Sequence, residues 1–203
     1  MFMIFKLLPI LLLAMFTASV FAQMPAIEPG VSHDLAIWRA AHYSDVRYKL
    51  NLTLEKMSPV LKGTVEIRMN IRDAETRGRG DAVSEPGAVA TGLTPIILDW
   101  RKIRGSESLS TISNVSLNGV GLKNPPADAG GSDLESNEHL IFRDGVKLGE
   151  NVIKLDFTSP ILTSGAAVTR YVDKEDGGEY IYSLFVPSDA STAFPVSRSC
   201  KSE

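Results

Sequence analysis

Cysteine and histidine are scarce in this sequence, and their scarcity excludes several kinds of site. Cys200 is the only cysteine among 203 residues, so the chain cannot form an internal disulfide or a zinc site that needs several cysteines. The histidines are His33, His42 and His139, and no two have the spacing with which one helix presents two imidazoles to a zinc ion. We therefore predict that the chain holds no metal ion and that its histidines have ordinary structural or surface roles.

Sequence signals for catalysis are also missing. There is no Gly-x-Ser-x-Gly nucleophile motif, and Cys200 lies in a polar tail without a group that could activate it. Basic blocks are absent as well, because 21 lysines and arginines face 24 acidic residues and give a net charge of −3. Surfaces that bind nucleic acid normally carry an excess of basic residues. We predict no catalytic residue, no cofactor and no nucleic-acid partner for this chain.

The amino terminus is strongly apolar. Residues 1–22 carry one charge, at Lys6, and end in Val20-Phe21-Ala22, with small residues at the first and third places. A cationic start, an apolar middle and a small-residue end are typical of a secretory signal peptide. We predict cleavage after Ala22, which changes the net charge from −3 to −4, and export to the periplasm or the extracellular space. The alternative is an uncleaved segment that anchors the chain and is its only contact with a membrane. The apolar run is, however, short for a membrane-spanning helix.

One short helix and then a series of strands follow this segment. Residues 23–31 form a spacer, and residues 32–42 are predicted to be a helix capped by Ser32. Apolar and polar residues alternate over residues 46–55 and 64–71, which is typical of strands with one buried face. The pattern also indicates a hairpin turn at Asn118-Gly119 and strands at residues 95–100, 115–117, 138–142, 152–157 and 180–186.

These elements predict an all-β fold, an antiparallel β-sandwich with a short amino-terminal helix. Sheets that are apolar on one side must bury those sides against each other. Residues 72–93 and 123–137 have no periodicity and are predicted to be exposed loops. Asp173, Glu175 and Asp176 are predicted to form a charged hairpin turn rather than a calcium site.

Several segments, in a fixed order, resemble one enzyme family. The most specific segment covers residues 180–195 and contains Asp189-Ala190 and Ala193-Phe194-Pro195. Weaker matches precede it in the same order: Val46-Arg47-Tyr48, Leu61-x-Gly63-x-Val65, Ile97-Leu98-Asp99-Trp100, Val115-x-Leu117-Asn118-Gly119 and Leu148-Gly149-x-Asn151. Together, over residues 35–195, they are similar to the opening of the zinc aminopeptidases of the aminopeptidase N family, which are gluzincin metallopeptidases, in a bacterial secreted branch.

The resemblance implies that residues 32–195 form the family's amino-terminal β-sandwich domain, which in full-length relatives packs on a zinc-dependent catalytic domain. In many relatives the closing segment carries Gln-x-Glu, and the glutamate holds the free amino group of the peptide. Leu184 and Val186 stand at these two places, so the resemblance implies that they form part of the wall of the substrate pocket without binding the amine.

The family's catalytic signatures, a Gly-Ala-Met-Glu-Asn strand and a His-Glu-x-x-His helix, do not occur in this chain. Residues 196–203 no longer match the family and are predicted to be a tail that follows a truncation or a frameshift. Zinc and peptide substrates would therefore belong to the full-length parent enzyme. The partner of this chain would be the missing catalytic domain.

Three functions remain open at this point. The chain could be an inactive amino-terminal domain of a secreted zinc aminopeptidase, or a free-standing sandwich that binds peptide or protein. It could also be a secreted carbohydrate-binding or adhesion module. A downstream reading frame that encodes the zinc helix would favour the first function, a specific soluble partner the second, and retention on a glycan column the third.

Overall fold

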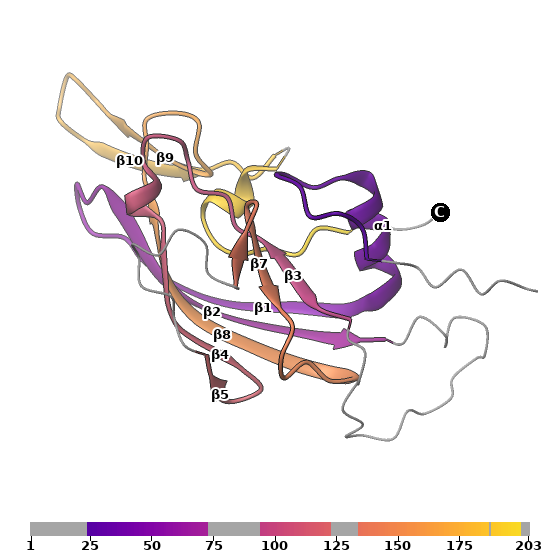
Figure 1. Cartoon of the computed structure of the whole chain (residues 1–203). Helices are drawn as coiled ribbons and strands as arrows, with labels where there is room; N and C mark the ends of the chain where they lie inside the picture. Colours follow the sequence, from indigo (N-terminus) through magenta and orange to yellow (C-terminus); the bar gives the residue numbers. More distant parts are fainter. Residues whose placement is uncertain (1–23, 73–93, 123–133, 187, 200–203) are drawn as a thin grey trace, which may run out of the picture.

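The computed structural model of the chain describes residues 24–72, 94–122, 134–186 and 188–199. The predicted signal peptide, residues 73–93 of the first predicted loop, residues 123–133 of the second and Cys200 lie outside these residues. Strands dominate the described part, in agreement with the predicted fold class (Figure 1). Within the described residues, no helix has the length and apolar character needed to cross a membrane.

Helix α1 (His33–His42) opens the fold, as its sequence predicts. The hydroxyl of Ser32 accepts a hydrogen bond of 3.1 Å from the backbone N–H of Leu35, which is the contact expected of a helix cap. Leu35 and Trp38 are buried on the inner face of the helix, while Ile37 is exposed. The helix therefore covers the core with one face only.

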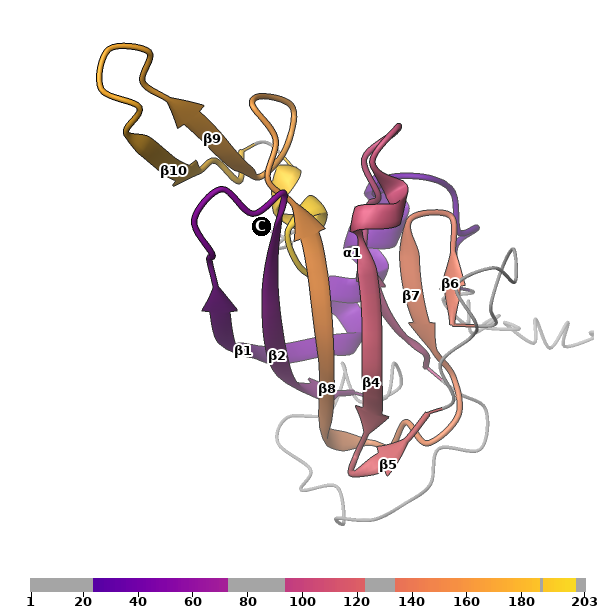
Figure 2. The same cartoon turned by 90° about the vertical axis from the view of Figure 1, so that its left-hand side faces the viewer.

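A five-stranded antiparallel sheet forms one layer of the molecule, with strand order β1-β2-β8-β4-β5 (Figure 2). Its strands are β1 (Tyr43–Thr53), β2 (Val60–Ile71), β8 (Gly149–Pro160), β4 (Thr111–Leu117) and β5 (Val120–Gly121). The predicted turn at Asn118-Gly119 is confirmed, because both residues have positive φ and β4 pairs with β5 across them.

A smaller three-stranded sheet forms the second layer, with order β3-β7-β6. It comprises β3 (Ile96–Asp99), β7 (His139–Phe142) and β6 (Glu135–Ser136), and every residue of β3 and β7 is buried. Side chains of both sheets and of α1 belong to one hydrophobic core, which includes Trp38, Ile67, Leu98, Leu140 and Phe157. This arrangement confirms the antiparallel β-sandwich with a short amino-terminal helix.

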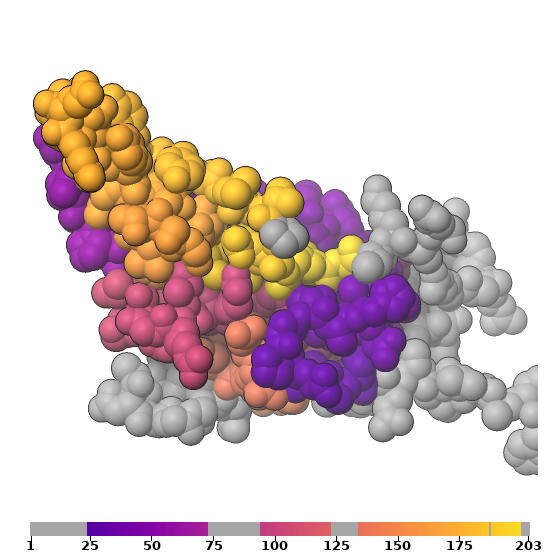
Figure 3. Space-filling view, turned by 90° about the horizontal axis from the view of Figure 1, so that it is seen from above, coloured from indigo at the N-terminus to yellow at the C-terminus, as the bar shows by residue number. Residues whose placement is uncertain are grey.

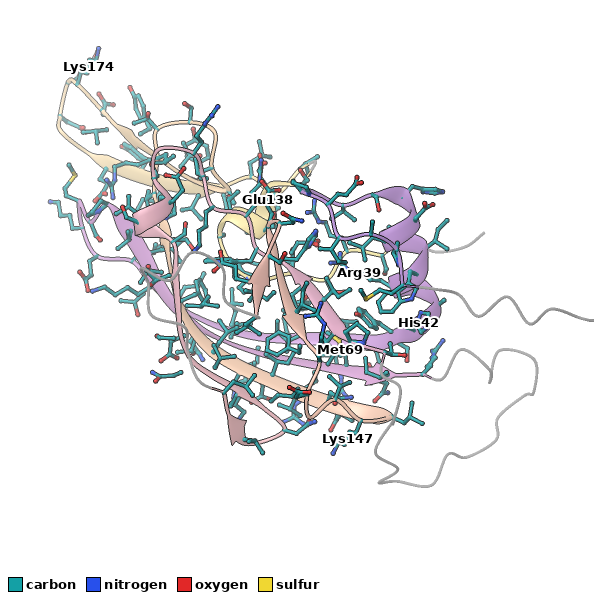
Figure 4. The ribbon with its side chains drawn as sticks, viewed as in Figure 1. Arg39, His42, Met69, Glu138, Lys147 and Lys174 are labelled. Atoms are coloured by element: carbon teal, nitrogen blue, oxygen red, sulfur yellow. The ribbon has the colours of Figure 1, made fainter. Side chains whose placement is uncertain are left out.

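A two-stranded hairpin of β9 (Val168–Val172) and β10 (Glu179–Ser183) projects from one end of the sandwich, with Lys174 at its tip (Figures 1 and 4). The predicted turn between these strands is confirmed, since Tyr171 pairs with Tyr180. Two short 3₁₀ helices, Glu107–Leu109 and Asp189–Thr192, were not predicted. Strand β9 was not predicted either, and the loop predicted at residues 123–137 is wrong at Glu135–Ser136, which form strand β6 because they pair with β7.

Two predictions about strands need correction. The alternation over residues 46–54 predicted one buried face, but Leu52 and Leu54 are half exposed because they line an open groove. The strand predicted at residues 180–186 ends at Ser183. In the antiparallel hairpin Ser183 pairs with Val168, the first residue of β9, so the residues after Ser183 have no strand to pair with. In both places the pattern predicts a core face, because a groove wall and a core face have the same alternation.

Candidate functional site

Large apolar side chains that are exposed to solvent gather at the end of the sandwich that carries the hairpin. We call this set the apolar end. It comprises side chains from the end of β1 and the turn that follows it, from both strands of the hairpin, and from the segment after β10: Leu52, Leu54, Met57, Tyr171, Val172, Tyr180, Tyr182, Leu184, Phe185 and Val186. Figure 3 shows the hairpin at one end of the molecule and α1 at the other.

Two charged residues of the hairpin, which pair with each other, attach it by hydrogen bonds to the turn between β1 and β2. Arg170 of β9 and Glu179 of β10 form an ion pair of 2.7 Å on the face toward the turn. The Glu179 carboxylate accepts hydrogen bonds of 3.0 and 3.1 Å from the Met57 N–H, and Arg170 donates to the carbonyl of Ser58. A two-stranded hairpin is marginally stable alone, so these contacts fix its position.

A groove of about 250 Å³ lies between the hairpin and the edge of the large sheet. Its lining is almost entirely apolar: Leu52, Leu54, Leu61, Val168, Ile181, Tyr182, Ser183, Phe185, Ala193 and Phe194. Phe194 is one of the lining residues and contacts the ring of Phe185 edge to face, with ring centres 5.8 Å apart. The groove can take an apolar side chain, because it offers few hydrogen-bonding groups to a polar one.

The two residues predicted for the pocket wall lie beside this groove rather than inside it. Leu184 and Val186 are 58% and 70% exposed, and neither lines the groove. Phe185, which stands between them, lines the groove instead. The wall role of Leu184 and Val186 stays a prediction, and Phe185 is the residue of this segment that sequence reasoning did not single out.

The segment that follows β10 is fixed in place by polar contacts with the core. Asp189 pairs with Arg101 at 2.6 Å, and the Thr192 hydroxyl accepts a hydrogen bond of 2.9 Å from the Ala167 N–H. The Ser159 hydroxyl donates to the carbonyl of Ala193. These contacts hold Phe194 in the groove, so the residues that carry the family resemblance position the apolar end.

A buried cluster of charges ties this segment to the rest of the fold. Asp99 of β3 accepts from Arg39 of α1 and from Arg198 of the carboxy-terminal segment, each at 2.7 Å. His139 Nδ1 lies 3.0 Å from the same carboxylate. Burial alone would raise the pKa of Asp99, but the contacts with His139, Arg39 and Arg198 hold it below its ordinary value. Figure 4 shows Arg39 between α1 and the small sheet.

The Asp99 cluster gives the carboxy-terminal segment a structural role. Val196 forms a β-bridge with Asp99, through backbone hydrogen bonds of 2.6 and 3.0 Å. Ser197 N–H donates to the Tyr48 hydroxyl at 2.7 Å, and Arg198 lies against Asp99. The predicted domain boundary at Pro195 stays a prediction, but residues 196–198 contact the core directly. Sequence reasoning missed this cluster because its members are far apart in the chain.

In the part of the chain that the structure describes, the three histidines lie apart from one another and do not form a zinc site. His33 begins α1 and is exposed, whereas His42 is buried at the other end of the helix with Nδ1 2.7 Å from the Trp38 carbonyl. His139 lies in the Asp99 cluster beside two arginines. Among the described residues, no three histidine, cysteine or acidic side chains are grouped so that they could hold a metal ion.

Comparison with known proteins gives a likeness of fold. No protein-family model and no curated protein sequence matches the chain. A structure of native leukotriene A4 hydrolase from yeast is similar over 83% of this chain, with 12% identity and a TM-score of 0.51. Two further yeast structures of that enzyme, one native and one with bestatin, match 76% and 85% of the chain with TM-scores of 0.49. The chain spans less than a quarter of their length, between 21% and 23%. At this identity the similarity establishes a shared fold and no more.

Proposed function

We propose that this chain is the amino-terminal β-sandwich domain of an exported zinc aminopeptidase and has no catalytic activity of its own. Its role is to pack on the catalytic domain through the apolar end, where Leu184 and Val186 form part of the wall around the bound peptide. The zinc ion and the peptide-cleaving groups belong to that second domain. Export through the apolar segment at residues 1–22 is part of the proposal.

The observation that carries the proposal is the position of the apolar end. The segment that most resembles the aminopeptidase N family, residues 180–195, runs from the hairpin into the groove, where large apolar side chains are open to solvent. Exposed apolar patches of this kind mark interaction sites. The shared fold with yeast leukotriene A4 hydrolase is compatible with the β-sandwich part of this proposal.

The proposal is tested by measuring which part of the sandwich becomes protected when the second domain is present. The DNA beyond the codon for Pro195 is first read in all three frames for the His-Glu-x-x-His helix. The encoded domain is then expressed in continuous fusion with this chain. We expect slower hydrogen exchange at residues 180–186 and in the turn at Met57. Exchange in β2 should not change, because its backbone is already paired with β1 and β8.

Matched variants distinguish protection by direct contact with the second domain from protection caused by a general increase in the stability of the sandwich. Leu184→Ser and Val186→Ser together should weaken the protection, because they remove apolar surface that is exposed in the chain alone. Lys154→Ser, on the outer face of the large sheet, serves as the control and should have no effect. Absence of a zinc helix in every frame, or protection of the outer face instead of the apolar end, would contradict the proposal.

A second candidate function rests on the groove itself. A lining of Leu52, Leu54, Ile181, Phe185 and Phe194 could hold an apolar side chain of a peptide without a catalytic domain. This free-standing binding module predicts a monomer that binds an apolar peptide. Replacing Leu54 by Ser would then reduce peptide affinity, whereas under the first proposal the isolated chain has no measurable peptide binding.

A further inference from the structure

Strand β1 forms the outer edge of the five-stranded sheet and is paired on one side only. Figure 2 shows it as the outermost strand, next to β2. In the described part of the chain, no strand lies along its other side. An uncovered strand edge presents unpaired N–H and C=O groups and is a template for pairing with another chain. The open edge of β1 can therefore accept a further strand.

The backbone of β1 bonds alternately to β2 and to its open edge. The Ile161 N–H donates to the Pro59 carbonyl at 2.8 Å, so odd-numbered residues of β2 bond to β8 and even-numbered residues bond to β1. Asn51 lies opposite an even-numbered residue of β2 and therefore bonds to β2. Leu50 and Leu52, on either side of it, direct their N–H and C=O groups to the open edge. Within the described ranges, these groups have no partner.

Exposed apolar side chains follow the same edge. Tyr48, Leu52 and Leu54 are 39%, 50% and 51% exposed, although they lie on the side of the sheet that faces the core. On the neighbouring strand β2, Val65 and Ile67 are buried on that side. The apolar side of the sheet is therefore uncovered at its free edge, where a further strand would cover it.

We propose that β1 pairs in antiparallel orientation with β1 of a second copy of this chain, around a two-fold axis at Asn51. Leu50 of each copy then lies opposite Leu52 of the other, and the backbone groups at the open edges exchange hydrogen bonds. Tyr48 lies opposite Leu54, so the exposed apolar side chains cover each other. Such an isologous pairing closes at two copies and joins the two large sheets into one. The inference goes beyond the proposed function and does not depend on it.

The charges on the outer face of β1 favour a second copy as the partner. Arg47 and Glu55 stand four residues to either side of Asn51, and their side chains are 56% and 58% exposed. The two-fold axis places Arg47 of each copy opposite Glu55 of the other, which gives two cross-strand pairs of opposite charge. Such pairs stabilise neighbouring strands. A register centred on Leu50 would instead place Glu55 opposite Asp45, and like charges in that position are destabilising.

Disulfide cross-linking tests the register. In a background of Cys200→Ser, which removes the only cysteine, Asn51→Cys places the two new thiols opposite each other. Facing Cα atoms in a pair without hydrogen bonds lie about 4.5 Å apart, within the range of a disulfide. We expect a covalent dimer under mild oxidation. Lys49→Cys, on the same face of β1, is the control, because its two copies are separated by four positions along the strands and lie beyond disulfide reach.

A charge exchange tests the contacts across the edge. The chain is purified after export, and its dimer affinity is measured by sedimentation equilibrium. Arg47→Glu makes both cross-strand pairs repulsive and should weaken the dimer by about tenfold or more. Adding Glu55→Arg restores opposite charges and should recover most of that loss. Lys154→Glu changes the net charge equally on the same face, but two strands away from the edge, and should have no effect.

A further variant distinguishes this dimer from association through the apolar end. Leu184→Ser with Val186→Ser should leave the dimer intact and reduce only further association, because neither residue belongs to β1. A chain that shows no dimer at any concentration would overturn the proposal. So would a dimer that is lost in this variant, a dimer in which the charge exchange recovers nothing, or cross-linking at Lys49→Cys but not at Asn51→Cys.

Discussion

Replacing Asp99 by Asn should be among the most destabilising conservative changes in the chain. The carboxylate accepts from Arg39 and Arg198, each at 2.7 Å, and Arg39 is fully buried. The amide has the same shape but carries no charge, so it leaves a buried guanidinium without its counter-ion. Breaking a buried ion pair on one side costs about 3 to 5 kcal/mol. This is a large part of a typical folding stability of about 5 to 15 kcal/mol.

Urea unfolding followed by circular dichroism measures this change. With a slope of about 2 kcal/mol per molar, a loss of about 4 kcal/mol lowers the midpoint by about 2 M. Asp156→Asn is the matched control, because Asp156 accepts from Asn114 at 2.6 Å on the exposed face of the large sheet. Its cost should stay below about 1 kcal/mol. Equal midpoint shifts for the two variants would refute the reasoning about the Asp99 cluster.

Three further outcomes follow from the same structure. The folded-state pKa of Asp99 is lowered, so its stabilisation is present above the unfolded-state value of about 3.9 and is lost as the pH falls through the folded-state value. The difference in urea midpoint between the unmodified chain and Asp99→Asn should therefore shrink in acid. Gly63→Ala should destabilise by about 1 to 3 kcal/mol in thermal unfolding, because a Cβ there would lie 2.5 Å from the buried ring of Phe157. Gly119→Ala should cost about 1 kcal/mol in the same assay, because its φ of +83° is strained for alanine.

The local parts of the fold could be predicted from the sequence because short-range patterns determine them. Ser32 caps α1, and Asn118-Gly119 makes its hairpin turn, since each acts on residues a few positions away. The alternation in β2 also predicts its buried face, because β2 is paired on both sides and its inner face is covered along most of its length. In these elements local sequence and burial agree.

The long-range parts could not be predicted because they depend on pairs that no local pattern reveals. Asp99 stood in an apolar run, and nothing near it in sequence indicated Arg39 or Arg198, which are 60 and 99 residues away. The alternation of Tyr180, Tyr182, Leu184 and Val186 did not show that this face is open to solvent. Alternation gives the side on which residues lie, and only the assembled fold shows what covers that side.

The state of the isolated chain in solution tests the central claim most directly. Sedimentation velocity with a hydrophobic fluorescent dye reports both association and accessible apolar surface. If a second domain normally covers the apolar end, the chain alone should bind the dye and associate as its concentration rises, and Leu184→Ser with Val186→Ser should reduce both. A chain that stays monomeric at high concentration and binds no dye would contradict the claim, and would favour the free-standing binding module.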